Sequence, residues 1–514
     1  MNSKLDYIFD LIKKNKLQEA KIICLDSIKL DNKNSEIFNI YAMVLFQLEE
    51  HNEALNNWKK AVELNPKYFY AYSNLGNAFL ILKRYEEALK SYDEAIKIKP
   101  DHIAILKNKA NILKGLKKLN ESAEQWNSII KINPSDINSY IEKAHIFLDL
   151  NRLVEALNVY MQAYLINPEH PFLLGHIVHV KSKICDWKDF SKYLKELEIH
   201  INNNKKVCTP FLALTHFDNP LLQKKVSETW VKEFTTTNAL ETLPNKNIKK
   251  KIKIGYYSSD LRTHAVGHLM VSMLELHDKS KFEIFGFYFG GELDEKDLLQ
   301  KRIINSFDKF SNISLMSNTE VLKLSKDLNI DIAVDLMTHT GSINRFGIFM
   351  YHVAPIQVNF LGYPGTSGST SIDYLIADKI LIPEENKKFY SEKIVYLPNS
   401  YQPNEKNKEI TEKKFTKLEL GLPNKGFIFG CFNGHQKINP EIFDSWIKIL
   451  NQNDDSIIWL LEDNQHSKEN LKLEASSRGI NPKRLIFAKM LPFKEHLERL
   501  KFVDLFLDTF PYNA

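Results

Sequence analysis

A proline recurs every 34 residues in the first third of the chain, at Pro66, Pro100, Pro134 and Pro168. Other positions keep the same period: an aromatic residue stands eight positions before each proline, and small residues stand twelve and twenty-four positions before it. These positions are Trp58, Tyr92, Trp126 and Tyr160; Ala54, Ala88, Ser122 and Ala156; and Ala42, Gly76, Ala110 and Ala144. A fixed period of this length predicts a stack of like units, because one such unit cannot bury its apolar face alone.

The pattern predicts two helices in each unit. Small residues allow the two helices to approach closely, and the proline ends the second helix. This pattern resembles the tetratricopeptide repeat, and we assign it to residues 1–170. An earlier unit keeps Ala20 in register but has Asn32 at the proline position. The resemblance implies a superhelix whose inner face binds an extended peptide.

Four asparagines fall into two registers of this repeat. Asn74 and Asn108 share one register, and Asn77 and Asn111 share the other. Aligned amides can hold a peptide backbone without contacting its side chains, so we predict that they bind an extended peptide. The alternative is that they are exposed or cap local structure.

The repeat pattern ends after Pro168. Apolar residues continue at helical spacing, and residues 238–251 are polar and basic. We therefore predict a helical cap and linker over residues 171–250.

From residue 251 onward, short β-branched and aromatic runs alternate with helical stretches. This alternation predicts parallel, doubly wound sheets. We divide the region into two Rossmann-like lobes, 251–410 and 411–514, the second incomplete. The fold class is thus multidomain, an all-α superhelix followed by α/β lobes. The sequence contains no dinucleotide glycine fingerprint, P-loop or H-E-x-x-H motif and no carboxylate cluster that suggests a metal.

Charge and cysteine content narrow the partners and the compartment. The 69 basic and 64 acidic residues give a net charge of +5, which offers no reason to expect nucleic acid or an anionic membrane. The four cysteines form no C-x-x-C pair, and no long apolar run is present. We expect a cytoplasmic protein with reduced thiols.

One candidate catalytic residue follows the first predicted strand. His264 falls where that strand turns into a helix. A helix N-terminus disfavours the imidazolium, and a neutral imidazole can accept a proton from a hydroxyl. The alternative is a capping or structural histidine. His268, one turn later, is expected to pack or to lie on the helix face.

Three further stretches suggest a phosphate or nucleotide site. Gly362, Gly365 and Gly368 can bring backbone close to a ligand, with Thr366 adding a hydroxyl. Lys437 stands beside the helix cap expected at Asn439, a position suited to a diphosphate. Alternatives are a tight structural loop and an exposed lysine. His496 could contact a nucleotide base or could be an exposed helical histidine.

Several strings together resemble the O-GlcNAc transferase and SPINDLY family. They are CDW at 185–187, IGYYSSDLRTH at 254–264, PIQVNFLGYPGTSG at 355–368, the segment from Asp373, CFNGHQKINP, and VDLFLDTFPYNA. The resemblance implies two lobes of the GT-B type and inverting transfer of N-acetylglucosamine from UDP-GlcNAc to Ser or Thr of proteins, without a required metal or cofactor. It implies catalytic His264 and a donor site of Lys437, Gln436, His496, Gly365 and Thr366.

Some positions depart from that pattern, which leaves alternatives open. Gly434 stands where some members carry an amide, Phe493 where some carry a lysine, and His339 where many have an aromatic. The family continues past the position of Ala514, so we expect a fragment rather than a protein that has lost activity. A SPINDLY-like O-fucosyltransferase that uses GDP-fucose and an inactive repeat scaffold are the other hypotheses.

Overall fold

A computed structural model describes residues 2–234, 251–341 and 345–513. The chain forms two compact units, Met1–Pro168 and Glu169–Ala514. In the part of the chain that is described, no helix combines the length and apolar character needed to span a bilayer.

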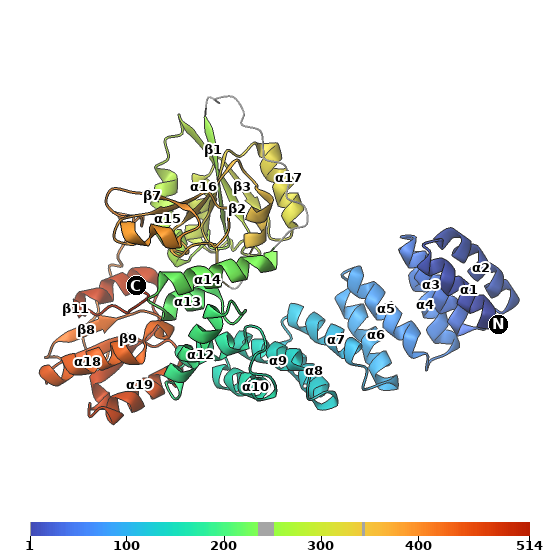
Figure 1. Cartoon of the computed structure of the whole chain (residues 1–514), viewed down its shortest axis with the longest axis horizontal. Coiled ribbons are helices and arrows are strands. Elements are labelled where there is room, and N and C mark those ends of the chain that lie inside the picture. The colour runs from blue at the N-terminus through green and yellow to red at the C-terminus, as the bar shows by residue number, and fades with distance from the viewer. Residues whose placement is uncertain (1, 235–250, 342–344, 514) are drawn as a thin grey trace. The chain divides into compact units, whose positions relative to one another are not determined.

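The first unit consists of five helical hairpins (Figure 1). Each hairpin corresponds to one 34-residue repeat, which confirms the predicted tetratricopeptide architecture, including the partial first unit. The helices are α1 (Asn2–Lys13), α2 (Leu17–Leu30), α3 (Ser35–Gln47), α4 (His51–Leu64), α5 (Phe69–Ile81), α6 (Tyr85–Ile98), α7 (Ile103–Gly115), α8 (Leu119–Ile132), α9 (Ile137–Asp149) and α10 (Leu153–Ile166).

The turn inside each hairpin repeats with the same period. One residue per turn has a positive φ of between 56° and 63°, and the next residue's N–H donates to a carbonyl five positions earlier. This is a Schellman-type helix end. The residues with positive φ are Asn15, Glu49, Lys83, Lys117 and Asn151. None is glycine, so residue type alone did not indicate this register.

The small and aromatic registers pack against each other within a repeat. A Cβ on Gly76 would lie 2.5 Å from the ring of Tyr92, so this close contact requires glycine. The Tyr92 hydroxyl donates to Asn77 of the same repeat at 2.6 Å and accepts from Asn108 of the next at 3.3 Å. The aromatic side chain therefore links the two helices of its own unit as well as neighbouring units.

The second unit begins with four helices: α11 (Leu173–Lys183), α12 (Phe190–Asn202), α13 (Pro210–His216) and α14 (Pro220–Val231). We predicted them as a cap on the superhelix, but they belong to the α/β unit. Asn464 donates to the Lys183 carbonyl at 2.9 Å, and the Trp187 ring packs on Phe443 at 5.2 Å. The CDW string thus anchors these helices to the second lobe. Residues 235–250 of the predicted linker lie outside the described residues.

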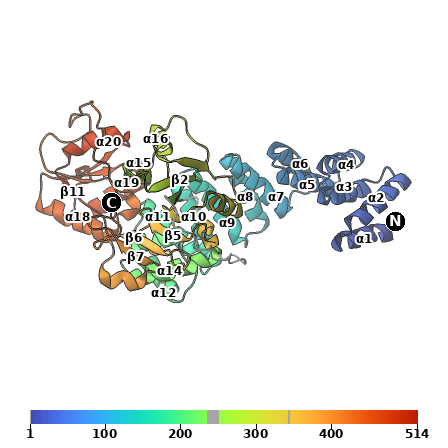
Figure 2. The ribbon, with the colours of Figure 1, turned by 90° about the horizontal axis from the view of Figure 1, so that it is seen from above.

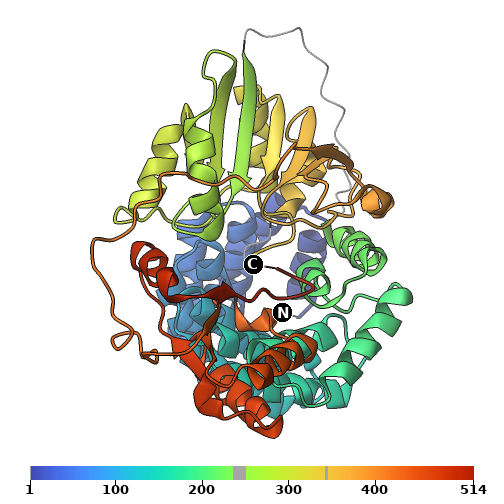
Figure 3. The same ribbon diagram turned by 90° about the vertical axis from the view of Figure 1, so that its left-hand side faces the viewer.

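The first lobe contains a seven-stranded parallel sheet (Figure 3). Its strands run in the order β3-β2-β1-β4-β5-β6-β7. They are β1 (Ile252–Ser258), β2 (Phe282–Tyr288), β3 (Lys309–Asn312), β4 (Ile332–Asp335), β5 (Ile356–Phe360), β6 (Tyr374–Ala377) and β7 (Lys393–Tyr396), with helices α15 (Ala265–Glu275), α16 (Leu298–Ser306) and α17 (Asn318–Leu328). The strand order reverses between β1 and β4, where ligands bind in doubly wound sheets.

The second lobe repeats this arrangement on a smaller scale, with a four-stranded parallel sheet. Figure 2 labels its last strand, β11 (Leu505–Phe506). The strand order is β10-β9-β8-β11. The elements are β8 (Ile428–Cys431), β9 (Ile457–Leu461), β10 (Leu485–Ala488) and β11 (Leu505–Phe506), with α18 (Pro440–Gln452), α19 (Gln465–Ser477) and α20 (Phe493–Arg499). The two lobes confirm the predicted pair of Rossmann-like sheets.

Candidate functional site

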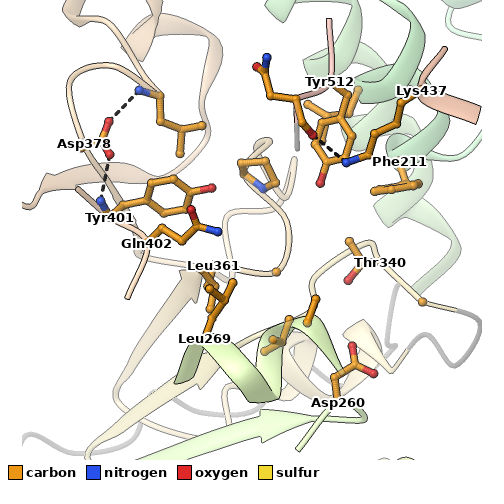
Figure 4. A pocket seen from close by; sticks show the side chains of 18 of the residues that line it. Phe211, Asp260, Leu269, Thr340, Leu361, Asp378, Tyr401, Gln402, Lys437 and Tyr512 are labelled. Carbon is orange, nitrogen blue, oxygen red and sulfur yellow. Dashed lines mark hydrogen bonds between the residues drawn. The ribbon is translucent and has the colours of Figure 1, made fainter. Parts of the chain in front are cut away.

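A cavity of about 1140 Å³ lies at the carboxyl ends of the first sheet's strands (Figure 4). Ligands of open α/β sheets bind at this edge. The lining comes from segments far apart in the sequence: α13 and α14, residues 259–269, the loops around Thr340 and Leu361, residues 399–402, Gln436 with Lys437, and residues 511–513. Among the predicted site residues, it brings together His264, Gln436 and Lys437.

His264 caps helix α15 and borders the cavity. Its Nδ1 accepts the Val266 N–H at 3.3 Å and lies 3.5 Å from Asp260 Oδ2. In a neutral ring that accepts at Nδ1, the proton is on Nε2. In this tautomer Nε2 can donate a hydrogen bond to a ligand, whereas a ring protonated at Nδ1 toward Asp260 leaves Nε2 able to accept a proton. The capping role considered from the sequence is therefore present alongside the cavity position.

The glycines of the 362–368 loop are needed for packing inside the protein. A Cβ on Gly362 would lie 1.9 Å from the Leu336 carbonyl oxygen, and one on Gly368 would lie 2.4 Å from the Ser227 backbone. Gly362 borders the cavity, but Gly365 and Thr366 do not. Contact of Gly365 and Thr366 with a donor stays a prediction, and the packing of the loop also fits the tight-loop alternative.

The Thr366 hydroxyl is hydrogen-bonded to the carboxylate of Glu392. This hydroxyl donates to Glu392 Oε2 at 2.7 Å, and the Ser367 N–H donates to Oε1 at 2.6 Å. Burial raises the pKa of Glu392, although the hydrogen bonds from Ser367 and Thr366 oppose that effect. A buried carboxylate thus fixes the loop that forms one wall of the cavity.

We expect Glu392→Gln to destabilise the protein by about 2 kcal/mol, since one loop donor loses a charged acceptor inside the protein. Urea denaturation followed by tryptophan fluorescence measures this difference. Glu385→Gln, at an exposed position nearby, is the control and should leave the midpoint unchanged. Equal midpoints for both variants would contradict a clamping role.

Lys437 is a cation at the cavity wall whose partners in the structure are uncharged (Figure 4). Its Nζ donates to the Asn513 carbonyl at 2.6 Å and lies 4.4 Å from the centroid of the Tyr512 ring. Burial lowers its pKa, an effect that Asp508 opposes. No carboxylate of the described residues lies within ion-pair distance of Nζ. The ammonium group can therefore receive an anionic ligand.

The surroundings of Lys437 add polar groups. Asn439 caps α18 by accepting the Ile442 N–H at 2.9 Å, and Pro440 is the first helical residue, as predicted. The Gln436 amide lies over Gly434, within 2.7 Å of the place a Cβ would take. The glycine at 434 thus leaves room for the Gln436 side chain at the cavity.

His496 lies on α20, outside the lining of this cavity. Its Nδ1 accepts from Arg499 Nε at 2.9 Å, and its ring packs edge-on against Phe432. Burial and Arg499 lower its pKa to about 4. Its role at a nucleotide base stays a prediction. Phe493, one turn earlier, stacks on His268 with ring centroids 4.1 Å apart, so His268 is a packed residue.

Three of the four predicted asparagines, Asn74, Asn77 and Asn108, are hydrogen-bonded to other side chains of the repeats. Asn74 donates to Asn39 at 2.9 Å, and Asn108 donates to Asn77 at 3.1 Å. These bonds link the first helices of successive repeats. Asn111 is exposed, and its side chain makes no hydrogen bond with another described residue. Peptide binding by the four residues stays a prediction.

Several cavity residues were missed from the sequence. Asp378 accepts the N–H groups of Leu381 at 2.8 Å and Tyr401 at 2.9 Å and so shapes the wall that carries Gln402 (Figure 4). Burial raises the pKa of Asp378, but backbone N–H donors hold it below its usual value. Phe211 comes from α13, and no sequence motif marks it. Tyr512 and Asp260 lie in the quoted family strings, which were the available signal.

His339 is buried behind the cavity and should make stability depend on pH. Its Nε2 is bonded to the Ser367 carbonyl at 2.8 Å, and burial lowers its pKa from 6.5 to about 4. Burial of the neutral ring stabilises the fold fully above pH 6.5, and this contribution is lost as pH falls toward 4. Between pH 7.5 and pH 5.5, the free energy of unfolding of His339→Phe should therefore fall by about 1 kcal/mol less than that of the wild type. Urea midpoints at both pH values measure this, and parallel losses would contradict it.

Comparison with known proteins gives one family across this unit. The glycosyl transferase family 41 profile matches residues 184–418 and 406–514, and tetratricopeptide repeat profiles match 43–82, 69–102 and 137–170. A probable UDP-N-acetylglucosamine–peptide N-acetylglucosaminyltransferase SEC of Arabidopsis thaliana is 30% identical over 355 residues, 65% of this chain and 36% of that protein. The probable enzyme of the same activity named SPINDLY in Oryza sativa subsp. japonica is 28% identical over 331 residues, 62% of this chain and 35% of its own length.

Among solved structures, a mutant of the Thermobaculum terrenum O-GlcNAc transferase aligns with all of this chain and 78% of its own, with a TM-score of 0.54 and 19% identity. At this identity the likeness concerns the fold. The chain spans little more than a third of the two curated plant relatives.

Proposed function

The chain belongs to glycosyl transferase family 41, and on that premise we propose that it transfers N-acetylglucosamine from UDP-GlcNAc to serine or threonine of proteins. The names of the plant relatives support this donor and a peptide acceptor. A cavity of about 1140 Å³ exceeds the usual range for a single small ligand, roughly 300–1,000 Å³. It has room for a nucleotide sugar together with an acceptor side chain.

The observation that carries this proposal is the environment of the Lys437 ammonium group. Its ammonium group faces the cavity against a carbonyl and a ring, beside the N-terminus of the 13-residue helix α18. A helix N-terminus and a lysine together favour a diphosphate. Lys437 would neutralise the charge that develops on the leaving UDP, which lets the transfer proceed without a bound metal.

The reaction forms a bond between the acceptor hydroxyl oxygen and the anomeric carbon of the sugar. The bond from that carbon to the donor phosphate breaks, and its electron pair leaves with UDP, with inversion at the carbon. Because Nε2 of His264 carries the proton in the capping tautomer, we assign His264 to orienting the sugar. The acceptor proton then passes to a phosphate oxygen of the donor.

The repeats provide the second part of the proposal. Tetratricopeptide superhelices present an extended inner surface suited to peptides, and Asn111 offers an exposed amide that no described residue hydrogen-bonds. We infer that this unit recruits the acceptor protein.

Isothermal titration calorimetry of the chain with UDP, GDP, UDP-GlcNAc and GDP-fucose tests the donor. We expect UDP and UDP-GlcNAc to bind and the guanosine compounds to bind at least about tenfold more weakly. Preference for GDP-fucose would move the assignment to O-fucosyl transfer. A folded chain that binds none of the four would refute the donor site and leave a repeat scaffold.

A further inference from the structure

A second cavity, of about 280 Å³, opens on the tetratricopeptide unit between α5, the start of α6 and α7. Four apolar residues form most of its wall: Leu80, Tyr85, Ile112 and Leu116. Its volume is just below the roughly 300–1,000 Å³ of small-molecule sites. A space of this size and lining suits one apolar side chain better than a whole cofactor.

A glycine lines this cavity at a repeat position that carries a side chain in the neighbouring repeats. Gly115 lines it, and a Cβ added there would meet no atom within 4 Å. The positions 34 residues before and after Gly115 carry side chains, Ile81 and Asp149. The same helix position therefore accepts side chains in neighbouring repeats, and a side chain at position 115 would meet open space beside the cavity. We call this cavity the Gly115 pocket.

Two amides border the Gly115 pocket. The Nδ2 of Asn108 is occupied by Asn77 and Tyr92, which leaves its Oδ1 as an acceptor. The Asn111 side chain is exposed and makes no hydrogen bond with any described residue. A peptide backbone presents both donors and acceptors, and these amides match it beside the apolar space.

The surroundings of the pocket are positively charged. Residues 103–118 contain five lysines and no acidic residue. Four of them are paired, with Asp136, Asp93, Glu142 and Glu86. Lys117, next to the lining residue Leu116, and Lys83, two residues before Tyr85, form no ion pair within the described part of the chain. Both lysines are exposed and close in sequence to lining residues, so this excess positive charge favours an acidic ligand.

We propose that the Gly115 pocket binds an apolar side chain of an extended peptide segment that carries acidic residues beside it. The apolar side chain enters the space left by Gly115, Asn108 and Asn111 hold the backbone, and Lys83 and Lys117 attract the acidic neighbours. This inference rests on the proposed function in that the segment belongs to the acceptor protein.

Fluorescence anisotropy with the full 514-residue chain tests the proposal. The probes are fluorescein-labelled peptides of about ten residues with a Gly-Ser host and the central sequence Asp-Leu-Asp, Asp-Ser-Asp or Lys-Leu-Lys. We expect Asp-Leu-Asp to bind about tenfold more tightly than Asp-Ser-Asp, because only leucine buries apolar surface. Lys-Leu-Lys should bind more weakly than Asp-Leu-Asp, and increasingly so at low salt.

Gly115→Leu is the decisive variant, because its side chain occupies the pocket. Gly115→Leu should lower the affinity for Asp-Leu-Asp to the level of Asp-Ser-Asp, and its affinity for Asp-Ser-Asp should equal that of the wild type. Gly115→Ala should keep most of the difference in affinity between the two peptides. Circular dichroism checks that both variants fold. The proposed role of the pocket is overturned if the leucine and serine peptides bind equally, if none of the peptides binds, or if Gly115→Leu keeps the wild-type affinity for Asp-Leu-Asp. The proposed acidic preference is overturned if Lys-Leu-Lys binds as tightly as Asp-Leu-Asp.

The nucleotide site gives an independent readout in the same samples. Gly115→Leu should bind UDP like the wild type, since its position lies on the other compact unit. A loss of peptide discrimination with intact UDP binding therefore concerns the pocket alone. If UDP does not bind to a chain that still discriminates the peptides, the donor assignment fails and the pocket stands.

Discussion

Lys437→Ala is expected to weaken UDP binding by roughly 10- to 100-fold, which corresponds to the loss of a charged hydrogen bond to phosphate. The structure gives the reason for this size. The Lys437 ammonium lies at the cavity wall with a carbonyl and the Tyr512 ring as its contacts. A diphosphate would supply the anion that the described residues do not place within ion-pair distance.

Calorimetry with UDP measures the effect. Lys437→Met keeps the apolar length of the side chain and removes its charge, so it should resemble Lys437→Ala. Lys448→Ala removes a lysine from the exposed face of the same helix, and its affinity should match the wild type. If Lys437→Met binds UDP normally, the ammonium group is not the phosphate ligand.

The second large effect is expected from Gly368→Ala, a destabilisation of about 3 kcal/mol. Gly368 has a φ of +72°, which strains any residue with a Cβ, and that Cβ would lie 2.4 Å from the Ser227 carbonyl carbon and 2.5 Å from the Glu228 nitrogen. Both neighbours are backbone atoms of α14, so the contact cannot be relieved by a side-chain rotation. The substitution pushes the glycine-rich loop away from the helix that borders the cavity.

Gly421→Ala separates the backbone strain at positive φ from the contact of the added Cβ with α14. Gly421 has nearly the same φ, +68°, but no atom lies within 4 Å of its added Cβ. Only backbone strain remains there, so we expect a loss of about 1 kcal/mol. Urea denaturation of both variants, followed by tryptophan fluorescence and by circular dichroism, gives the comparison. Equal losses would show that the contact with α14 does not tighten this loop.

Much of the fold could be predicted because its signals are local and periodic. The 34-residue register of prolines, aromatics and small residues identified the superhelix, and apolar runs that alternate with helical stretches identified the two sheets. Strand β3 has no such apolar run, because its sequence, KFSN, is short and polar and lies at the sheet edge. Such an edge strand is fixed by its hydrogen bonds to β2 and carries little hydrophobic pattern.

The site was only partly predictable, and the reason is the distance along the chain between groups that meet in space. The sequence by itself determined the repeat architecture, the order of the two lobes and the family strings that contain His264, Gln436 and Lys437. Only the tertiary structure decided that Thr366 is used by Glu392, that the glycines of the loop fit against Leu336 and α14, and that α11–α14 belong to the α/β unit. Those roles depend on backbone and side-chain atoms from other elements, whose approach no local residue pattern records.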